Sequence, residues 1–448
     1  MSRLHDVLRR ASLRRIVVNV TWLFSDKIIR MGVGLFVGVW LARYLGPSDF
    51  GLLSFATALV GLATTIATLG LPHVAVRDLV RDTPRAAETL GATAVLHLFA
   101  GMLAFSLLAI VILFLRPDDP RAQTVVLITG GVLLLRASQV AVYWFEARVA
   151  SRSVVWVQSS AFLAVAATKA VAILSGASLV VFAWLILIEA MLASLGLLLL
   201  LHHRGVPLPS LRAPSRRIST LLKESWPLAL SGVAVVVYMK IDQVMLAQMV
   251  DDTSVGIYAS AVRLSDAWYF VPVAIVASVF PAILNAKARS STEYNARFQL
   301  LFDGLALLAV LIAIPMTVAA TPIVTMLYGA AYVSAGPVLA VHIWASLFVF
   351  VGVAGGRWYV AEGRQMLALQ RTVLGAFTNI ALNLLLIPTY GPLGAAFATI
   401  ASQMVASLFG DLLSPYTRQL FSMKASSLTL IGPIIRLMRA LNQHDIER

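Results

Sequence analysis

The chain has 448 residues, of which 59% are hydrophobic and 12% are charged, and its mean hydropathy is +0.86. Soluble domains contain about 25% charged residues, so this composition leaves little room for a sizeable water-soluble domain and favours a membrane protein. Cysteine is absent, which excludes a disulfide framework, thiolate metal sites and a cysteine nucleophile. The net charge of +14 does not indicate nucleic-acid binding, because the basic residues occupy short segments between apolar stretches.

The N-terminal segment 1–16 is basic and precedes an apolar stretch, as in a signal peptide. That apolar stretch is long, carries the charged residues Asp26, Lys27 and Arg30, and lacks a small-residue cleavage site. We therefore predict that it is retained as the first membrane helix.

A helix needs roughly 20 apolar residues to cross a bilayer core of about 30 Å. Scanning the sequence at that length predicts about twelve membrane spans. In chain order they are 17–42, 49–71, 90–115, 122–146, 153–175, 178–202, 224–249, 254–283, 298–321, 337–361, 364–387 and 391–415. Turn-forming pairs such as Gly46-Pro47 and Gly391-Pro392 separate neighbouring spans. The sequence thus predicts an all-α membrane protein.

The distribution of basic residues predicts the orientation. With the N-terminus inside, most of the 35 Lys and Arg residues fall in inside segments, and only Arg43, Arg116 and Arg121 fall in outside loops. This asymmetry is what the positive-inside rule expects. We predict that both termini are cytoplasmic and that the chain is a multi-pass protein of the bacterial or archaeal cytoplasmic (inner) membrane.

The two halves of the chain resemble each other. Leu41-Ala42 and Gly51 recur at the same spacing as Leu246-Ala247 and Gly256, and Glu146-Ala147-Arg148 corresponds to Glu362-Gly363-Arg364. Six spans per repeat give both halves the same orientation, with a cavity between them. Glycine at the start of a span also permits close helix approach.

This repeat predicts five segments. They are a basic cytoplasmic N-terminus (1–16), a six-helix bundle (17–202), a cytoplasmic linker (203–223), a second six-helix bundle (224–417) and an amphipathic cytoplasmic tail (418–448). We expect the tail to lie on the anionic membrane surface, and a thirteenth span is the competing interpretation.

Two signatures carry a family resemblance. The stretch Ala42-Arg43-Tyr44-Leu45-Gly46-Pro47-Ser48-Asp49-Phe50-Gly51 resembles the first-loop signature of Wzx-like polysaccharide flippases of the MOP superfamily. In the second half, Tyr238, Ile241-Asp242, Val255-Gly256-Ile257-Tyr258 and Arg263-Leu264 resemble the matching signature. The resemblance implies a V-shaped twelve-helix transporter that works by alternating access. It also implies a cargo of oligosaccharide linked to undecaprenyl pyrophosphate, for the export of O-antigen, capsule or exopolysaccharide.

Charged residues inside the predicted spans are expensive to insert, which favours a hydrated interior. The cations are Lys27, Arg30, Arg136, Lys169, Lys240, Arg263 and Arg357, and the acids are Asp26, Glu189, Asp242, Asp266, Asp303 and Asp411. A pyrophosphate head needs cationic donors in place of water. We predict that Lys27, Arg30, Arg136, Lys240 and Arg263 form a cationic, cargo-binding cavity.

Two acids are candidates for coupling transport to H⁺ or Na⁺, namely Asp26 and Asp242. A structural alternative stays open for Asp26, because Asp26 and Arg30 are spaced to form an ion pair within one helix. Arg136 has no acid within its own helix turn, so it needs a partner from another helix or from the cargo.

Several other intramembrane residues have structural interpretations. Arg263 and Asp266 are spaced to pair with each other, and Glu189 is expected as an isolated, protonated carboxyl or an ion-coupling group. Asp303 and Asp411 lie near span ends, where their side chains can reach water. His97 and His342 are expected as packed polar residues, because no second ligand lies at metal-binding spacing.

The competing functions are an ion-coupled multidrug exporter of the same superfamily and a membrane glycan polymerase or glycosyltransferase. The excess of cations at the membrane centre disfavours a carrier of cationic drugs. An enzyme of glycan assembly would need a sizeable extracytoplasmic loop, and a peptidoglycan-precursor flippase would typically have two more helices. No nucleotide-binding P-loop occurs, so we do not expect direct ATP hydrolysis. We predict a transporter that is not an enzyme and that uses no cofactor. Expected partners are membrane lipids and polysaccharide polymerase or export machinery.

Overall fold

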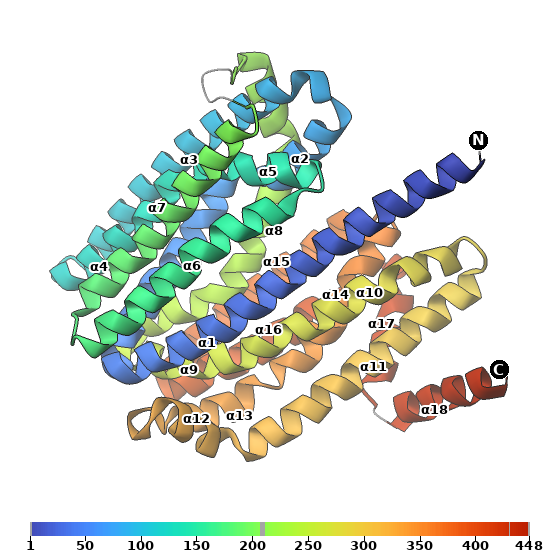
Figure 1. The fold of residues 1–448 in the computed structure, drawn as a ribbon. Helices are drawn as coiled ribbons and strands as arrows, with labels where there is room; N and C mark the ends of the chain where they lie inside the picture. Colours follow the sequence, from blue (N-terminus) through green and yellow to red (C-terminus); the bar gives the residue numbers. More distant parts are fainter. Residues whose placement is uncertain (1, 207–210, 430, 447–448) are drawn as a thin grey trace. The chain divides into compact units, whose positions relative to one another are not determined.

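The computed structural model describes residues 2–206, 211–429 and 431–446, in which every regular element is a helix (Figure 1). The side chains of 2–21, 23–26 and 439–446 lie outside the described residues. The predicted all-α class is therefore confirmed for the described part of the chain.

The α-helices follow one another with few long loops. They are α1 (Ser2–Thr68), α2 (Leu71–Arg81), α3 (Ala86–Leu115), α4 (Pro120–Gly130), α5 (Val140–Ala147), α6 (Ser151–Leu174), α7 (Leu179–His203), α8 (Ser215–Met249), α9 (Asp252–Asp266), α10 (Phe270–Lys287), α11 (Ser291–Val318), α12 (Ala320–Tyr328), α13 (Ala335–His342), α14 (Ala345–Ala361), α15 (Gln365–Tyr390), α16 (Pro392–Ser407), α17 (Arg418–Ser427) and α18 (Ile431–Ile446). Short 3₁₀ helices include η2 (Gly131–Gln139), η4 (Ala267–Tyr269) and η6 (Phe409–Leu413).

Eleven helical segments in the described part are long and apolar enough to cross a membrane, or up to twelve if the bent pair Pro415–Ser427 and Ile431–Met438 is one span. The first of these segments contains two predicted spans, because α1 breaks at Gly46, whose φ of 74° is left-handed. Glycine populates this region without a steric penalty, so the predicted turn at Gly46-Pro47 is confirmed.

Several predicted spans are interrupted, among them 391–415, which consists of α16 and η6. The predicted span 122–146 consists of α4, η2 and α5, 254–283 consists of α9, η4 and α10, and 337–361 consists of α13 and α14. The segment between the predicted spans 298–321 and 337–361 contains most of α12. Hydropathy detects the apolar length of a span, but it does not detect a local change from α to 3₁₀ geometry.

Contacts divide the chain into two compact units. Unit 1 comprises 1–45 and 52–236, and unit 2 comprises 46–51 and 237–448. The division falls inside α8 rather than in the predicted linker 203–223, so residues 224–236 belong to unit 1.

Contacts at the start of α8 explain this assignment. Arg217 Nη2 lies 2.9 Å from Asp78 Oδ2 on α2 and donates to the Thr89 hydroxyl on α3, also at 2.9 Å. The backbone of α8 passes so close to Gly70 that a Cβ there would overlap Ser225 and Ala229. Ion pairs and backbone packing therefore hold the first part of α8 within unit 1.

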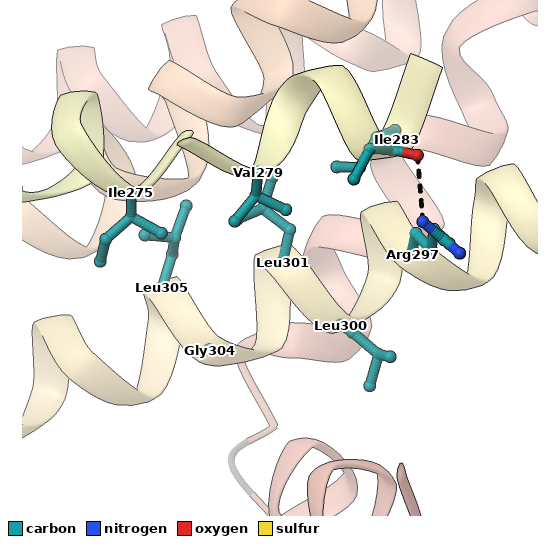
Figure 2. Close-up of a pocket in the computed structure, with 9 residues that line it drawn as sticks. Ile275, Val279, Ile283, Arg297, Leu300, Leu301, Gly304 and Leu305 are labelled. Atoms are coloured by element: carbon teal, nitrogen blue, oxygen red, sulfur yellow. Dashed lines mark hydrogen bonds between the residues drawn. The ribbon is translucent and has the colours of Figure 1, made fainter. Parts of the chain in front are cut away.

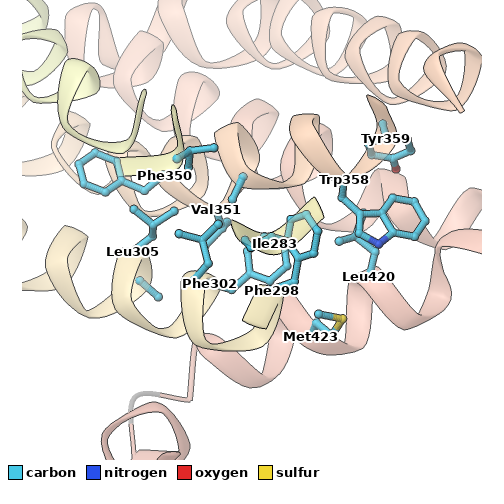
Figure 3. Packing of buried hydrophobic residues seen from close by; sticks show 14 of the residues in the cluster. Ile283, Phe298, Phe302, Leu305, Phe350, Val351, Trp358, Tyr359, Leu420 and Met423 are labelled. Carbon is cyan, nitrogen blue, oxygen red and sulfur yellow. The ribbon is translucent and has the colours of Figure 1, made fainter. Parts of the chain in front are cut away.

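Unit 2 has a large apolar core formed by α10, α11, α14 and α17 (Figure 3). Phe298 and Phe302 stack on α11 with ring centroids 5.9 Å apart, and Phe350, Trp358 and Leu420 surround them. Aromatic side chains spaced by four residues share one helix face, which explains the stacked pair.

The loop between α14 and α15 contains the repeated Glu-x-Arg motif. Glu362 accepts hydrogen bonds from Lys287 Nζ and from the Tyr294 hydroxyl, both at 2.8 Å. Burial alone would raise the pKa of the Glu362 carboxyl, but these hydrogen bonds and the Lys287 charge lower it below its ordinary value. In this half, the motif therefore joins two interhelical loops and has a structural role.

The two signature glycines meet within unit 2. A Cβ on Gly51 would overlap the Asp252 carbonyl oxygen, and a Cβ on Gly256 would overlap the Pro47 carbonyl oxygen. The predicted close helix approach at Gly51 and Gly256 is confirmed, and the two related loops pack backbone to backbone.

Gly256→Ala is expected to destabilise the protein by about 1–3 kcal/mol or more, because the opposing atoms are backbone and cannot move aside. Gly232→Ala is the matched control, since a Cβ at Gly232 on α8 meets nothing within 4 Å. Thermal unfolding of the purified variants measures the difference. Equal melting temperatures for the two variants would contradict the close packing.

Candidate functional site

Asp242 on α8 lies at the centre of a buried polar cluster in unit 2. The residue is 2% exposed. Its Oδ2 accepts hydrogen bonds from the Tyr258 hydroxyl at 2.6 Å and the Thr399 hydroxyl at 2.7 Å, and its Oδ1 accepts one from Asn383 Nδ2 at 2.7 Å. Four helices, α8, α9, α15 and α16, therefore converge on one carboxyl group.

The cluster continues along α15 and α16. Asn383 Nδ2 also donates to Asn379 Oδ1 at 3.0 Å, and Asn379 Nδ2 lies 3.4 Å from the Ser402 Oγ. The four-residue spacing of Asn379 and Asn383 puts both amides on one face of α15. Asn383 Oδ1 is buried without a hydrogen-bond partner in the described part of the chain.

This arrangement is suited to holding a proton or a small cation. Asn383 reaches the carboxylate with its Nδ2 donor, which leaves its Oδ1 as a second acceptor oxygen in the cluster; carboxylate and amide oxygens are ligands that hard cations prefer. Among the described residues, no basic side chain forms an ion pair with Asp242. A buried carboxylate without a cationic partner is costly, so uptake of a proton or a metal ion would stabilise it.

Lys240 and Arg263, both predicted to bind cargo, lie on α8 and α9, the helices that also carry Asp242 and Tyr258, but they have different surroundings. Lys240 is half-buried and acts electrostatically on Asp266. Arg263 is exposed, with its guanidinium 5.8 Å from the centre of the Phe50 ring. The Arg263–Asp266 ion pair that the spacing permits does not occur among the described residues, because spacing on a helix allows a pair without enforcing it.

In unit 1, the predicted site residues of the first helix fall at the edge of the described side chains. Lys27 is exposed, and Arg30 is half-buried with its guanidinium 5.4 Å from the centre of the Phe162 ring on α6. The side chain of Asp26 lies outside the described residues, so the predicted pair with Arg30 and its coupling role stay predictions.

Arg136 lies in η2, where the predicted fourth span leaves α-helical geometry. It is half-buried, and within the described ranges it has no ion-pair partner. Tyr143, on the following helix α5, places its hydroxyl 3.3 Å from His97 Nε2. His97 Nδ1 contacts the Ala67 carbonyl oxygen at 2.9 Å, so His97 is a packed polar residue as predicted. Arg136 is therefore a cation in an apolar span that is not neutralised by a described carboxylate.

Other intramembrane acids are paired with cations. Glu189 lies 3.3 Å from Lys169, so the prediction that it is isolated is wrong. Asp303 and Asp411 are fully buried rather than reaching water, and they pair with Arg436 and Lys424. These cations come from other helices, which a scan within one span cannot detect.

These pairings enlarge the cation excess. Three of the six predicted acids are neutralised by partners, and two of these partners, Lys424 and Arg436, lie outside the predicted spans. These three acids are therefore not available as counter-ions for Arg136 and Arg263.

Sequence reasoning missed several residues of the Asp242 cluster. Tyr258 was recognised only as part of a signature, and Asn379, Asn383 and Thr399 were not singled out. Two asparagines four residues apart inside the predicted span 364–387 are a signal that could have identified this face.

An apolar groove of about 560 Å³ lies between α10 and α11 in unit 2 (Figure 2). Ile275, Val279, Leu301 and Leu305 line it, and Arg297 stands at one end and donates from Nη1 to the Ala282 carbonyl oxygen at 3.0 Å. Neither the predicted cargo-binding residues nor the residues around Asp242 line this groove, so it is separate from both sets.

Comparison with known proteins places the chain in a family. Residues 16–287 match the family model described as "Polysaccharide biosynthesis protein". A probable flippase of Haloferax volcanii is 35% identical over 179 residues, which are 38% of this chain and 37% of that protein. A probable low-salt glycan biosynthesis flippase of the same organism is 24% identical over 88% of this chain and 81% of its own length.

Solved structures share the fold. An inward-facing multidrug resistance transporter of the MOP superfamily has a TM-score of 0.68 at 14% identity, covering 91% of this chain and 99% of its own. The lipid II flippase in an inward closed conformation has a TM-score of 0.67 at 15% identity, covering 96% and 100%.

The named relatives are transporters rather than enzymes, which agrees with the predicted class. The predicted resemblance to a family of polysaccharide biosynthesis is confirmed by the family match, and the predicted fold is shared with the two solved structures. The chain therefore belongs to the polysaccharide biosynthesis protein family and is a multi-pass membrane protein.

Proposed function

We propose that this protein is a flippase of glycan biosynthesis that moves an oligosaccharide linked to undecaprenyl pyrophosphate from the cytoplasmic to the outer leaflet by alternating access. It would act in the bacterial or archaeal cytoplasmic membrane, with both termini in the cytoplasm. The family match and the flippase names of the two Haloferax volcanii relatives support this class of activity.

The observation that carries the cargo assignment is Arg136, a half-buried cation in an apolar span without an ion-pair partner among the described residues. Taking a pyrophosphate into a low-dielectric medium without counter-charges costs tens of kcal/mol on Born estimates. Arginine offers paired donors that match phosphate oxygens. Arg136, with Lys27, Arg30, Lys240 and Arg263, would replace the water lost by the head group.

The Asp242 cluster supports ion coupling. Its donors enclose a carboxylate that can be neutralised by H⁺ or Na⁺, and α8 carries it into contact with α9, α15 and α16. A ligand that binds one conformation of these helices better than another shifts the transport cycle by its differential affinity. The negative-inside potential would assist the outward step, by about 2.3 kcal/mol per charge per 100 mV.

The test is translocation in proteoliposomes, with a short-chain prenyl-pyrophosphate oligosaccharide as cargo and a cationic dye as the competing cargo. We expect protein-dependent movement of the glycan to the opposite leaflet and no transport of the dye. Dye transport without glycan movement, across several glycans, would replace the flippase proposal by the multidrug exporter. A polymerase or export partner would be sought by crosslinking in native membranes once transport is established.

A further inference from the structure

A second buried charge cluster lies in unit 2, away from Asp242. Asp411 in η6 and Lys424 on α17 are both 0% exposed, and Lys424 Nζ lies 2.7 Å from Asp411 Oδ2. Lys424 also donates to the Ser407 carbonyl oxygen at 2.7 Å, and the Tyr359 hydroxyl donates to Asp411 Oδ1 at 2.6 Å. The Asp411 carboxylate therefore already has a close cation and a hydroxyl donor.

Arg371 on α15 is a second cation beside this pair. It is 8% exposed, and its guanidinium lies 4.7 Å from the centre of the Tyr359 ring. Its Nη1 is 3.9 Å from Asp411 Oδ1, which is too long for a hydrogen bond. In the described part of the chain, Nε and Nη1 of Arg371 are buried and have no hydrogen-bond partner.

The charges of this cluster do not balance. Two cations, Lys424 and Arg371, share one carboxylate, so the cluster carries a net positive charge. A buried charge without a close partner is costly, and buried charges are normally paired and hydrogen-bonded. The backbone makes room for both cations, since a Cβ on Gly355 would collide with Lys424 and a Cβ on Gly410 would collide with Arg371.

We propose that Arg371 binds a phosphate oxyanion, and that this oxyanion belongs to the lipid-linked cargo. The assignment to cargo rests on the proposed flippase function. A guanidinium with unused donors matches phosphate oxygens, and an anion there would neutralise the excess charge.

The position of Arg371 connects this site to the Asp242 cluster. On α15, Arg371 and Asn379 lie on the same buried face, about 12 Å apart along the axis at 1.5 Å per residue. The phosphate site and the Asp242 cluster would thus share helix α15, through which binding at one could change the affinity at the other if it shifts that helix.

A purely structural role for Arg371, as a partner of Asp411, predicts different behaviour on mutation. Removing one partner of a buried ion pair is strongly destabilising. Removing a surplus buried cation is not, so Arg371→Gln is expected to melt at or above the wild-type temperature without ligand. Lys424→Met is expected to melt lower. Equal losses for both variants would overturn the proposal.

The binding experiment uses the full chain in phosphatidylcholine nanodiscs, with farnesyl pyrophosphate as the probe. We expect Arg371→Gln to weaken binding at least tenfold, and Arg371→Lys to retain part of it because lysine keeps the charge but loses the paired donors. Arg364→Gln is the matched control, since it removes a cation near the start of the same helix, where Arg364 stacks on Tyr416 at 3.9 Å. It is expected to bind within twofold of wild type.

The outcomes separate the two proposals. Wild-type binding that Arg371→Gln leaves unchanged would overturn the Arg371 site and leave the flippase function standing. A folded wild type that binds no prenyl pyrophosphate would count against the flippase function itself. A third arm adds phosphatidylglycerol to the nanodiscs: displacement of the probe from wild type but not from Arg371→Gln would assign the site to a bilayer phospholipid and overturn its assignment to cargo.

Discussion

Asp242→Asn is expected to reduce the response of transport to an imposed H⁺ or Na⁺ gradient at least several-fold. Asparagine has nearly the shape of aspartate but cannot exchange a proton or carry the charge that holds a cation. Coupling between two ligands typically amounts to 5–150-fold in affinity, so gradient stimulation is expected to fall by a factor in about that range. Translocation in proteoliposomes with each gradient imposed separately measures the change.

The control for this experiment is Asp266→Asn. Asp266 is a half-buried acid on α9 that, among the described residues, forms no hydrogen bond with the amide and hydroxyl groups around Asp242. It is expected to retain most of the gradient response. If Asp242→Asn responds to both gradients like the wild type, Asp242 is a structural hydrogen-bond acceptor and the coupling proposal fails.

Arg136→Ala is expected to reduce the affinity for a prenyl pyrophosphate by about 10–150-fold. Hydrogen bonds to charged groups contribute about 1.5–3 kcal/mol, and each 1.4 kcal/mol is a factor of ten. Arg136→Lys should lose less, because a lysine keeps the charge but not the paired donors. Binding of farnesyl pyrophosphate to the purified full chain measures both variants.

Arg148→Ala is the matched control for Arg136, because it removes an exposed arginine that stacks on Trp144 at 4.0 Å beyond the end of α5. Its affinity is expected to equal that of the wild type. An unchanged affinity in well-folded Arg136→Ala protein would mean that Arg136 is held by packing near Tyr143 and takes no part in cargo binding. An equal loss in both variants would indicate non-specific attraction by surface charge.

The sequence by itself determined the class of protein, the positions of its membrane helices and its family. Spans are local properties, because a helix that crosses a bilayer must satisfy its own backbone groups and present about 20 apolar residues. The turn at Gly46 and the close approach at Gly51 and Gly256 were predictable for the same reason, since glycine is needed where φ is positive or backbones touch.

Only the tertiary structure decided which charges neutralise each other. Glu189 pairs with Lys169, 20 positions away, and Asp303 binds Arg436, 133 positions away. Asp242 accepts hydrogen bonds from Asn383 and Thr399, which lie 141 and 157 positions away in the sequence. A carboxylate inside a membrane needs a partner within a few ångströms, but helix packing brings that partner from any other helix. The sequence therefore predicted that intramembrane charges carry the function. Helix packing, which brings α8, α15 and α16 together, decided that amide and hydroxyl donors surround Asp242 and that Arg371 lies beside a buried ion pair.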